Sequence, residues 1–217
     1  GHKVTVLERR AQAGGLSARR AFGGFEVPGV RHDTSEIRPS LVESLGLSSR
    51  GVTMLSDHVP IFASEARGNG LLFHFDGARA KEEIAARSKK DADAYAALRG
   101  LLSRLRPMLE ALTDKGAPPL LPRGFGETIE MGLMGLKLRG LGRTDMIEFL
   151  RAAPMCVADW MREQFETEVL SATIAMPAVL GDFVGPWSPG TAAMLVLRDA
   201  VAVPGVKGGP AAVVDAL

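Results

Sequence analysis

The chain has 217 residues, and its 26 basic and 25 acidic side chains leave a formal net charge of +1. This balance gives no electrostatic reason to expect a nucleic-acid partner. The single cysteine, Cys156, excludes a disulfide within this sequence and a zinc site built from cysteines, and its apolar context predicts a buried structural thiol. The four histidines lack metal-binding spacing, so we expect no metal site.

The apolar runs are too short to span a bilayer, which takes ~20 residues of helix. The longest weakly polar stretch, Val169 to Gly181, is shorter than this and contains Pro177. We therefore expect a protein without a transmembrane segment, either cytoplasmic or in peripheral contact with a membrane.

The first structural signature is a short run near the start of the sequence. Residues Lys3 to Leu7 are β-branched and apolar, which is typical of a parallel strand covered on both faces. Glu8 ends the run, and a loop with two adjacent glycines, Gly14 and Gly15, follows. Parallel sheets place ligands at the carboxyl ends of their strands, so this loop is the first candidate site.

The next part of the chain predicts small elements and then a long helical block. Short apolar pieces bounded by glycine or proline predict a helix at 38–47 and extended segments at 23–33, 58–63 and 70–77. From Ala78 onward the apolar residues recur at helical spacing as far as Leu112. Ser88 and Asp91 are placed to begin the second helix of this block.

The second half of the chain predicts further helices separated by proline and glycine. They are expected at 126–141, 144–165, 166–181, 192–201 and 210–217, with a break at 181–191. Thr144 is the candidate N-cap of the second of them. Trp160 and Trp187 are both expected in the core.

This order of patterns predicts two domains. The front and the end have α/β character, and the middle is helical. We predict an α/β (α+β) fold in which an incomplete Rossmann-like, nucleotide-binding domain at 1–55 and 204–217 is interrupted by a mainly helical domain at 56–203.

The chemistry of the front loop suits an adenosine nucleotide. A glutamate at a strand end, such as Glu8, can accept hydrogen bonds from both ribose hydroxyls. Gly14 and Gly15 remove side chains, so the backbone can approach a pyrophosphate closely, and Arg10 can face the adenosine or the phosphates. A solvent-facing glutamate and an ordinary glycine turn explain the same residues, and the spacing alone does not choose between these interpretations.

The segment 1–20 resembles the stretch after the first βα unit in the FAD-dependent phytoene-dehydrogenase-like family, which is grouped with amine oxidases and carotenoid desaturases. In that family a V-x-V-L-E strand, an arginine and a glycine pair have the spacing of Glu8, Arg10, Gly14 and Gly15. Supporting similarity to the same family is found at 24–33, 40–47, 183–197 and 205–217.

The resemblance implies FAD as the cofactor and hydride transfer between the flavin and an apolar, isoprenoid-like small molecule. It implies that Glu8 holds the adenosine ribose and that Gly14 and Gly15 let the chain pass the pyrophosphate or the flavin; it names no catalytic residue. Leu16 departs from the basic residue that many relatives carry there. The family's G-x-G-x-x-G loop would lie ~20 residues before Glu8, so we expect an internal segment of a longer flavoprotein that binds FAD weakly or not at all by itself.

Two other classes of protein are compatible with the same residues. A transferase with a nucleoside cofactor, such as a methyltransferase, also binds ribose with an acidic strand end. A helical interaction module without enzymatic activity would carry the front strand incidentally. The glycine pair after the acidic residue and the long helical insertion favour the flavoprotein over the transferase.

Overall fold

A computed structural model describes residues 2–27, 29–31, 33–66, 68, 70–115, 121 and 124–217. The chain divides into two compact units. The small unit consists of Gly1–His58 and Ala202–Leu217, and the helical unit is Val59–Val201. The boundaries predicted from the sequence, after residues 55 and 203, lie close to these divisions.

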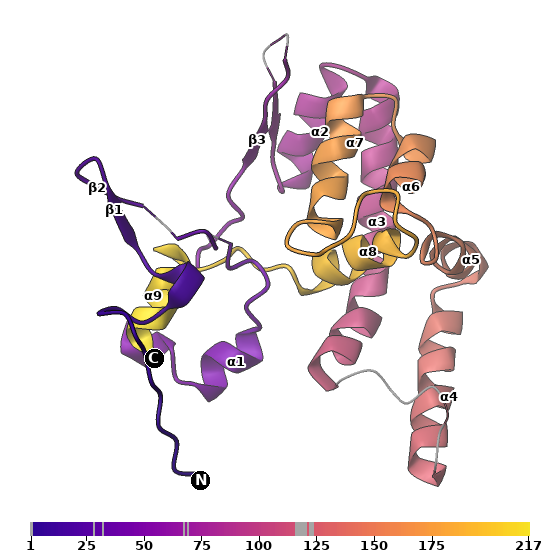
Figure 1. Cartoon of the computed structure of the whole chain (residues 1–217). Coiled ribbons are helices and arrows are strands. Elements are labelled where there is room, and N and C mark those ends of the chain that lie inside the picture. The colour runs from indigo at the N-terminus through magenta and orange to yellow at the C-terminus, as the bar shows by residue number, and fades with distance from the viewer. Residues whose placement is uncertain are drawn as a thin grey trace. The chain divides into compact units, whose positions relative to one another are not determined.

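The small unit contains short elements joined by turns. They are η1 Gly15–Ser17, β1 Arg20–Phe22, β2 Phe25–Val27, α1 Pro39–Ser44, η2 Ser48–Arg50 and α9 Gly209–Ala216. β1 and β2 form an antiparallel hairpin (Figure 1) whose turn residues, Gly23 and Gly24, both have positive φ. The short helix predicted to begin at Pro39 is thus confirmed, and the extended segment predicted at 23–33 contains β2, although Pro28 and His32 of that segment lie outside the described residues.

The end of the chain completes the small unit. Its buried core consists of Val42, Leu47, Val52 and Val206, so a residue near the C-terminus packs with three from the front. Backbone hydrogen bonds of 2.9 Å run from the N–H of Leu55 to the carbonyl of Gly205 and from the N–H of Lys207 to the carbonyl of Thr53. Residues 202–217 therefore belong structurally to the front segment, although some 140 residues separate them in sequence.

The strand predicted at Lys3 to Leu7 is wrong for this structure. The segment has no regular structure, and Val4, Val6 and Leu7 are 80%, 84% and 92% exposed. A parallel strand needs a hydrogen-bonded neighbour, and the strands of the described residues pair only as two antiparallel hairpins. The fold is mainly helical with a few short strands, which is compatible with the predicted α/β (α+β) class, but no Rossmann sheet is found among the described residues.

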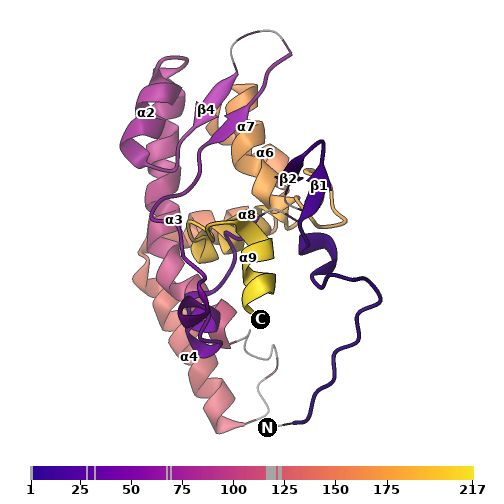
Figure 2. The ribbon, with the colours of Figure 1, turned by 90° about the vertical axis from the view of Figure 1, so that its left-hand side faces the viewer.

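The helical unit is built around one long helix. Its elements are β3 Ile61–Ala63, β4 Leu71–Phe73, α2 Gly77–Ala85, α3 Lys89–Lys115, α4 Phe125–Gly140, α5 Arg143–Ala152, α6 Val157–Gln164, α7 Glu168–Ala175, η3 Met176–Ala178 and α8 Thr191–Val201. The helices α2, α6 and α8 pack against α3, and the antiparallel β3–β4 hairpin lies beside α2 and α7 (Figures 1 and 2). No helix of the described residues is long and apolar enough to cross a membrane.

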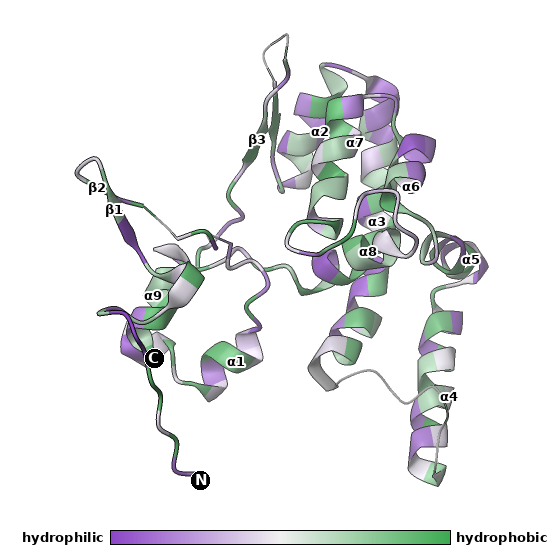
Figure 3. Cartoon of the chain, viewed as in Figure 1, coloured by the Kyte–Doolittle hydropathy of each residue, from purple (hydrophilic) through white to green (hydrophobic). Residues whose placement is uncertain are grey.

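The apolar stripe of α3 forms the centre of the core. Its members are almost fully shielded from solvent: Leu98, Leu101, Leu102, Leu105, Met108 and Leu109. The predicted stripe is thus confirmed, and Trp160, 1% exposed, joins it from α6. Figure 3 shows hydrophobic residues along α4 as well, so hydropathy alone does not mark which helices are buried.

Three local predictions differ from the structure. Trp187 is 60% exposed in the loop before α8, where the Arg162 guanidinium lies 5.3 Å from its ring centre, so it is not a core residue. Thr144 lies inside α5 and is not its N-cap, because Gly142 occupies that position with φ of 84°. Cys156 is half-buried at the start of α6.

A buried carboxylate connects the starts of two helices. The backbone N–H of Asp91 donates to Ser88 Oγ, which confirms the predicted start of α3. The Asp91 carboxylate is fully buried and accepts hydrogen bonds from the N–H groups of Glu166 (2.8 Å) and Thr167 (2.9 Å), just before α7. Burial alone would raise the pKa of Asp91, but these hydrogen bonds outweigh it, and the pKa lies below its ordinary value.

The substitution Asp91→Asn is therefore expected to lower the free energy of unfolding by about 2–3 kcal/mol at neutral pH, because a buried N–H loses its acceptor. Because folding lowers the pKa, the stabilisation is present above the ordinary carboxyl pKa and is lost as the pH falls through the folded value. The difference between wild type and variant should shrink below about pH 4. Urea unfolding at several pH values measures it. The matched control is Asp93→Asn, since the Asp93 side chain is 78% exposed.

Candidate functional site

The front loop places Glu8 and Arg10 next to each other, but not at a strand end. Both side chains are exposed, and the backbone N–H of Arg10 donates a 2.8 Å hydrogen bond to Glu8 Oε1. One carboxylate oxygen of Glu8 therefore accepts this local hydrogen bond. The other oxygen has no hydrogen-bond partner among the described residues. The proposed contact of Glu8 with a ribose stays a prediction.

The glycine pair has a clear role in packing. Gly14 has φ of +111° and precedes the short helix η1, which packs against α9. A Cβ at Gly14 would lie 3.0 Å from Val214 Cγ1 on α9 and 3.2 Å from the backbone N of Ala18. Gly15 also has positive φ, at +56°, but a Cβ there would have no neighbour within 4 Å. Gly14 is therefore required by the fold itself, whereas the space beside Gly15 is open.

An arginine ties this loop to the rest of the small unit. The Arg19 guanidinium lies 3.0 Å from an oxygen of Asp215 on α9 and 3.5 Å from one of Glu26 on β2. These pairs are exposed, so each contributes little to stability. They connect Arg19, which follows the glycine loop, with β2 and α9.

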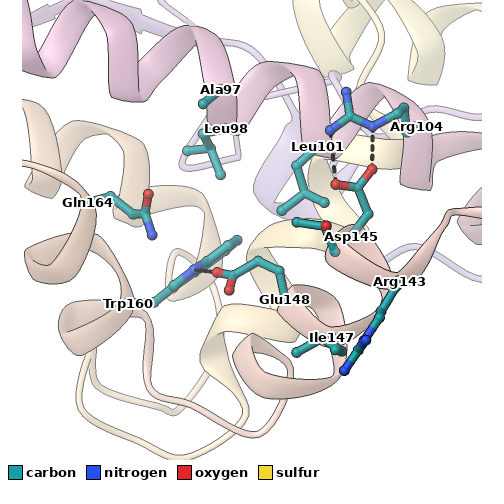
Figure 4. A pocket seen from close by; sticks show the side chains of 11 residues that line it. Ala97, Leu98, Leu101, Arg104, Arg143, Asp145, Ile147, Glu148, Trp160 and Gln164 are labelled. Carbon is teal, nitrogen blue, oxygen red and sulfur yellow. Dashed lines mark hydrogen bonds and ion pairs between the residues drawn. The ribbon is translucent and has the colours of Figure 1, made fainter.

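The helical unit contains a cavity of about 530 Å³ that the sequence did not reveal. It lies between α3, α5 and α6, and Figure 4 shows residues from all three helices around it. Its apolar lining includes Leu98 and Leu101 from α3 and Ile147 from α5. This volume lies within the range of small-molecule sites. The lining residues come from separate helices, so no spacing in the sequence could have brought them together.

The lining of the cavity also includes two carboxylates on α5, each paired with an arginine. Glu148 accepts hydrogen bonds from Arg151 (2.8 Å) and from Trp160 Nε1 (3.1 Å), and these keep its pKa below the ordinary value. Hydrogen bonds from Arg104 lower the pKa of Asp145 in the same way. Both carboxylates are ionised and neutralised at neutral pH. They therefore suit the orientation of a polar group better than the transfer of a proton near pH 7.

Metal coordination has no support in the described residues. No three side chains of histidine, cysteine, aspartate or glutamate within them gather closely enough to hold an ion.

Over 96% of its length the chain is similar to proteins named for an oxidoreductase domain. These are the mouse and rat proteins called pyridine nucleotide-disulfide oxidoreductase domain-containing protein 2, which are 26% and 25% identical over 228 and 222 residues. The chain spans 38% of the length of each of these relatives. No family model and no solved structure matches the chain.

The packing of the glycine loop leads to a graded prediction. Gly15→Ala should cost about 1 kcal/mol in the free energy of unfolding, because only its left-handed backbone is unfavourable. Gly14→Ala should cost about 2–3 kcal/mol, because the methyl group also meets Val214. Chemical unfolding of the two variants measures the difference. Equal losses would show that α9 does not pack on this loop in solution.

Proposed function

We propose that the chain is part of an FAD-dependent oxidoreductase of the phytoene-dehydrogenase-like type. The observation that carries the proposal is its similarity, along 96% of its length, to proteins named for an oxidoreductase domain. The motif of Glu8, Arg10, Gly14 and Gly15 supports a flavin in particular, because these residues have the order and spacing found in that family.

The residues of the front loop are compatible with the adenosine half of FAD. The Glu8 carboxylate is exposed and has one oxygen outside the local turn, so it can accept a hydrogen bond from a ribose hydroxyl. The open space beside Gly15 leaves room for a phosphate against the backbone. Bound FAD would supply the hydride acceptor, and this chain would bind and orient the cofactor.

The cavity of the helical unit is the proposed site for an apolar, isoprenoid-like substrate. Its apolar lining residues Leu98, Leu101 and Ile147 can contact a hydrocarbon chain. Glu148 and Trp160 also line the cavity, so a single polar end of the substrate can be oriented by them. A protein with such a substrate would work in the cytoplasm or at the surface of a membrane.

A nucleotide titration tests the role of Glu8 in the gene product at its natural length. Glu8→Gln should weaken FAD binding about tenfold, the value of one hydrogen bond to a charged group. It should leave FMN binding unchanged, because FMN lacks the adenosine. Flavin absorption near ~450 nm follows both titrations.

The matched control for this experiment is Glu43→Gln, an exposed glutamate on α1 of the same unit. Unchanged FAD affinity in the Glu8 variant would remove Glu8 from the site. A colourless wild-type protein that binds S-adenosylmethionine would instead favour the transferase.

The proposed substrate site is tested by a substitution that fills the cavity from its exposed side. Ile147 is 50% exposed and lines the cavity, so Ile147→Trp fills space without disturbing the core. With retinol as a fluorescent isoprenoid probe, we expect at least a tenfold loss of retinol affinity, because the tryptophan ring occupies space within the cavity. The control is Leu150→Trp on the same helix, at a residue that is 53% exposed and does not line the cavity. Equal retinol binding by both variants would place the substrate elsewhere.

A further inference from the structure

The helix α4 has two apolar faces, and only one of them is covered. Met134 and Leu138 on α4, with Leu141 just after it, are half-buried against the core of the helical unit. On the other side, four apolar residues are 48–83% exposed: Phe125, Ile129, Leu133 and Leu136. At 100° per residue these four fall within an arc of about 80°, so they form one stripe along the helix. We call this stripe the outer face of α4.

The outer face is unusual for an ordinary surface helix. All 16 residues of α4 are described, and none of them is buried. Surface helices normally place charged and polar residues on the side away from the core, whereas Figure 3 shows hydrophobic residues at several turns of α4. A contiguous apolar stripe of this kind marks an interaction surface.

Three of the four glycines of α4, Gly126, Gly132 and Gly140, lie on or beside this face, and Gly135 lies away from it. Gly132 and Gly140 fall within about 20° of the stripe or inside it. A Cβ at either position would meet nothing within 4 Å. Glycine weakens a helix interior, so its presence here needs a reason. Close approach of another backbone at this face supplies one.

The charges beside the stripe identify the partner. Glu130 and Lys137 lie on the same flank of the outer face, about 20° apart around the helix but seven residues apart along it. That separation, about 10 Å, is too long for an ion pair within one helix. Neither side chain forms a hydrogen bond or an ion pair within the described part of the chain.

An antiparallel second copy of α4 would pair these charges. We place the twofold axis between Gly132 and Leu133. The same flank of each helix then faces its counterpart, and position i of one copy lies opposite position 265 − i of the other. Glu130 then lies within about 3 Å, along the axis, of Lys137 of the second copy, and the same pair forms again by symmetry. Ile129 meets Leu136 of the second copy, again twice.

Other arrangements fit this face less well. A parallel pair would bring opposite flanks together and set Lys137 beside Arg139 of the second copy, which places like charges in contact. An anionic lipid surface would favour basic residues alone, whereas the exposed Glu130 carries a negative charge at the edge of the stripe. The charge pattern therefore favours a copy of the same helix.

We propose that the outer face of α4 is a homodimer interface in which two copies of the helix pair antiparallel about a twofold axis. The helix is about 24 Å long, so the interface is at the small end of specific protein contacts. The dimer should dissociate in the micromolar range. This inference goes beyond the proposed oxidoreductase function and does not depend on it.

Charge exchange tests the proposal in the purified protein. Sedimentation velocity over a range from micromolar to several hundred micromolar should show a concentration-dependent dimer. Glu130→Lys and Lys137→Glu should each raise the dissociation constant about fivefold to tenfold, because each creates two like-charge contacts. The double variant Glu130→Lys/Lys137→Glu should return to within about threefold of the wild type, because both pairs form again with reversed signs.

A second variant tests the apolar part of the interface. Leu133→Glu should remove dimerisation, since it places two carboxylates at the twofold axis. The matched control is Phe183→Glu, a fully exposed apolar residue elsewhere in the helical unit. It should dimerise like the wild type. Circular dichroism confirms that each variant is folded, which is expected because all the substituted side chains are exposed.

Three results would overturn the proposal. The first is a wild-type protein that stays monomeric at every concentration. The second is a dimer that persists in Leu133→Glu, or a double variant whose dissociation constant is as high as those of the single variants. The third is flotation of monomers with vesicles of phosphatidylcholine and phosphatidylserine that Leu133→Glu abolishes, which would assign the outer face to a lipid surface.

Discussion

The buried stripe of α3 is the constraint on which the helical unit depends. The six apolar residues of this stripe are buried, and α2, α6 and α8 bury their own apolar faces against the same helix. Asp91 adds direction to this non-directional packing, because its carboxylate accepts two N–H groups at the start of α7 and so fixes where that helix begins. The cavity between α3, α5 and α6 is shaped by the same packing, so the stability of the core and the shape of this cavity have a common origin.

Local features of the fold could be predicted from the sequence, since they depend on neighbouring residues. Helical spacing indicated α3, and the Ser88 hydroxyl caps its first turn as the residue type suggested. The run from Lys3 to Leu7 shows the limit of this approach: β-branched residues favour a strand, but a strand exists only when a partner supplies its hydrogen bonds. Trp187 shows another limit, because a large aromatic ring can cover an arginine at the surface as well as fill a core.

The candidate site residues also differ in whether the sequence alone could reveal them. The front motif is contiguous in sequence and was found there, whereas the cavity joins residues from three helices and has no sequence signal. The structure also adds a second explanation for one of the motif residues. Gly14 is needed where the loop packs on α9, so a glycine there is expected with or without a nucleotide. Gly15 has no such neighbour, so packing does not explain it, and under the proposed function it and the Glu8 carboxylate are the residues that would meet the nucleotide.

The two faces of α4 show what the hydrophobic effect requires of a helix that is apolar on opposite sides. Each face lowers the free energy only when water is removed from it. The inner face achieves this against the core through Met134 and Leu138, so it accounts for the position of the helix. It does not account for Leu133 and Leu136, which polar residues could replace without loss to the packing seen here. Periodicity predicts such a helix equally well whichever side is covered. Only the structure separates the residues used for folding from those left exposed, and the exposed ones are those that the proposed dimer would cover.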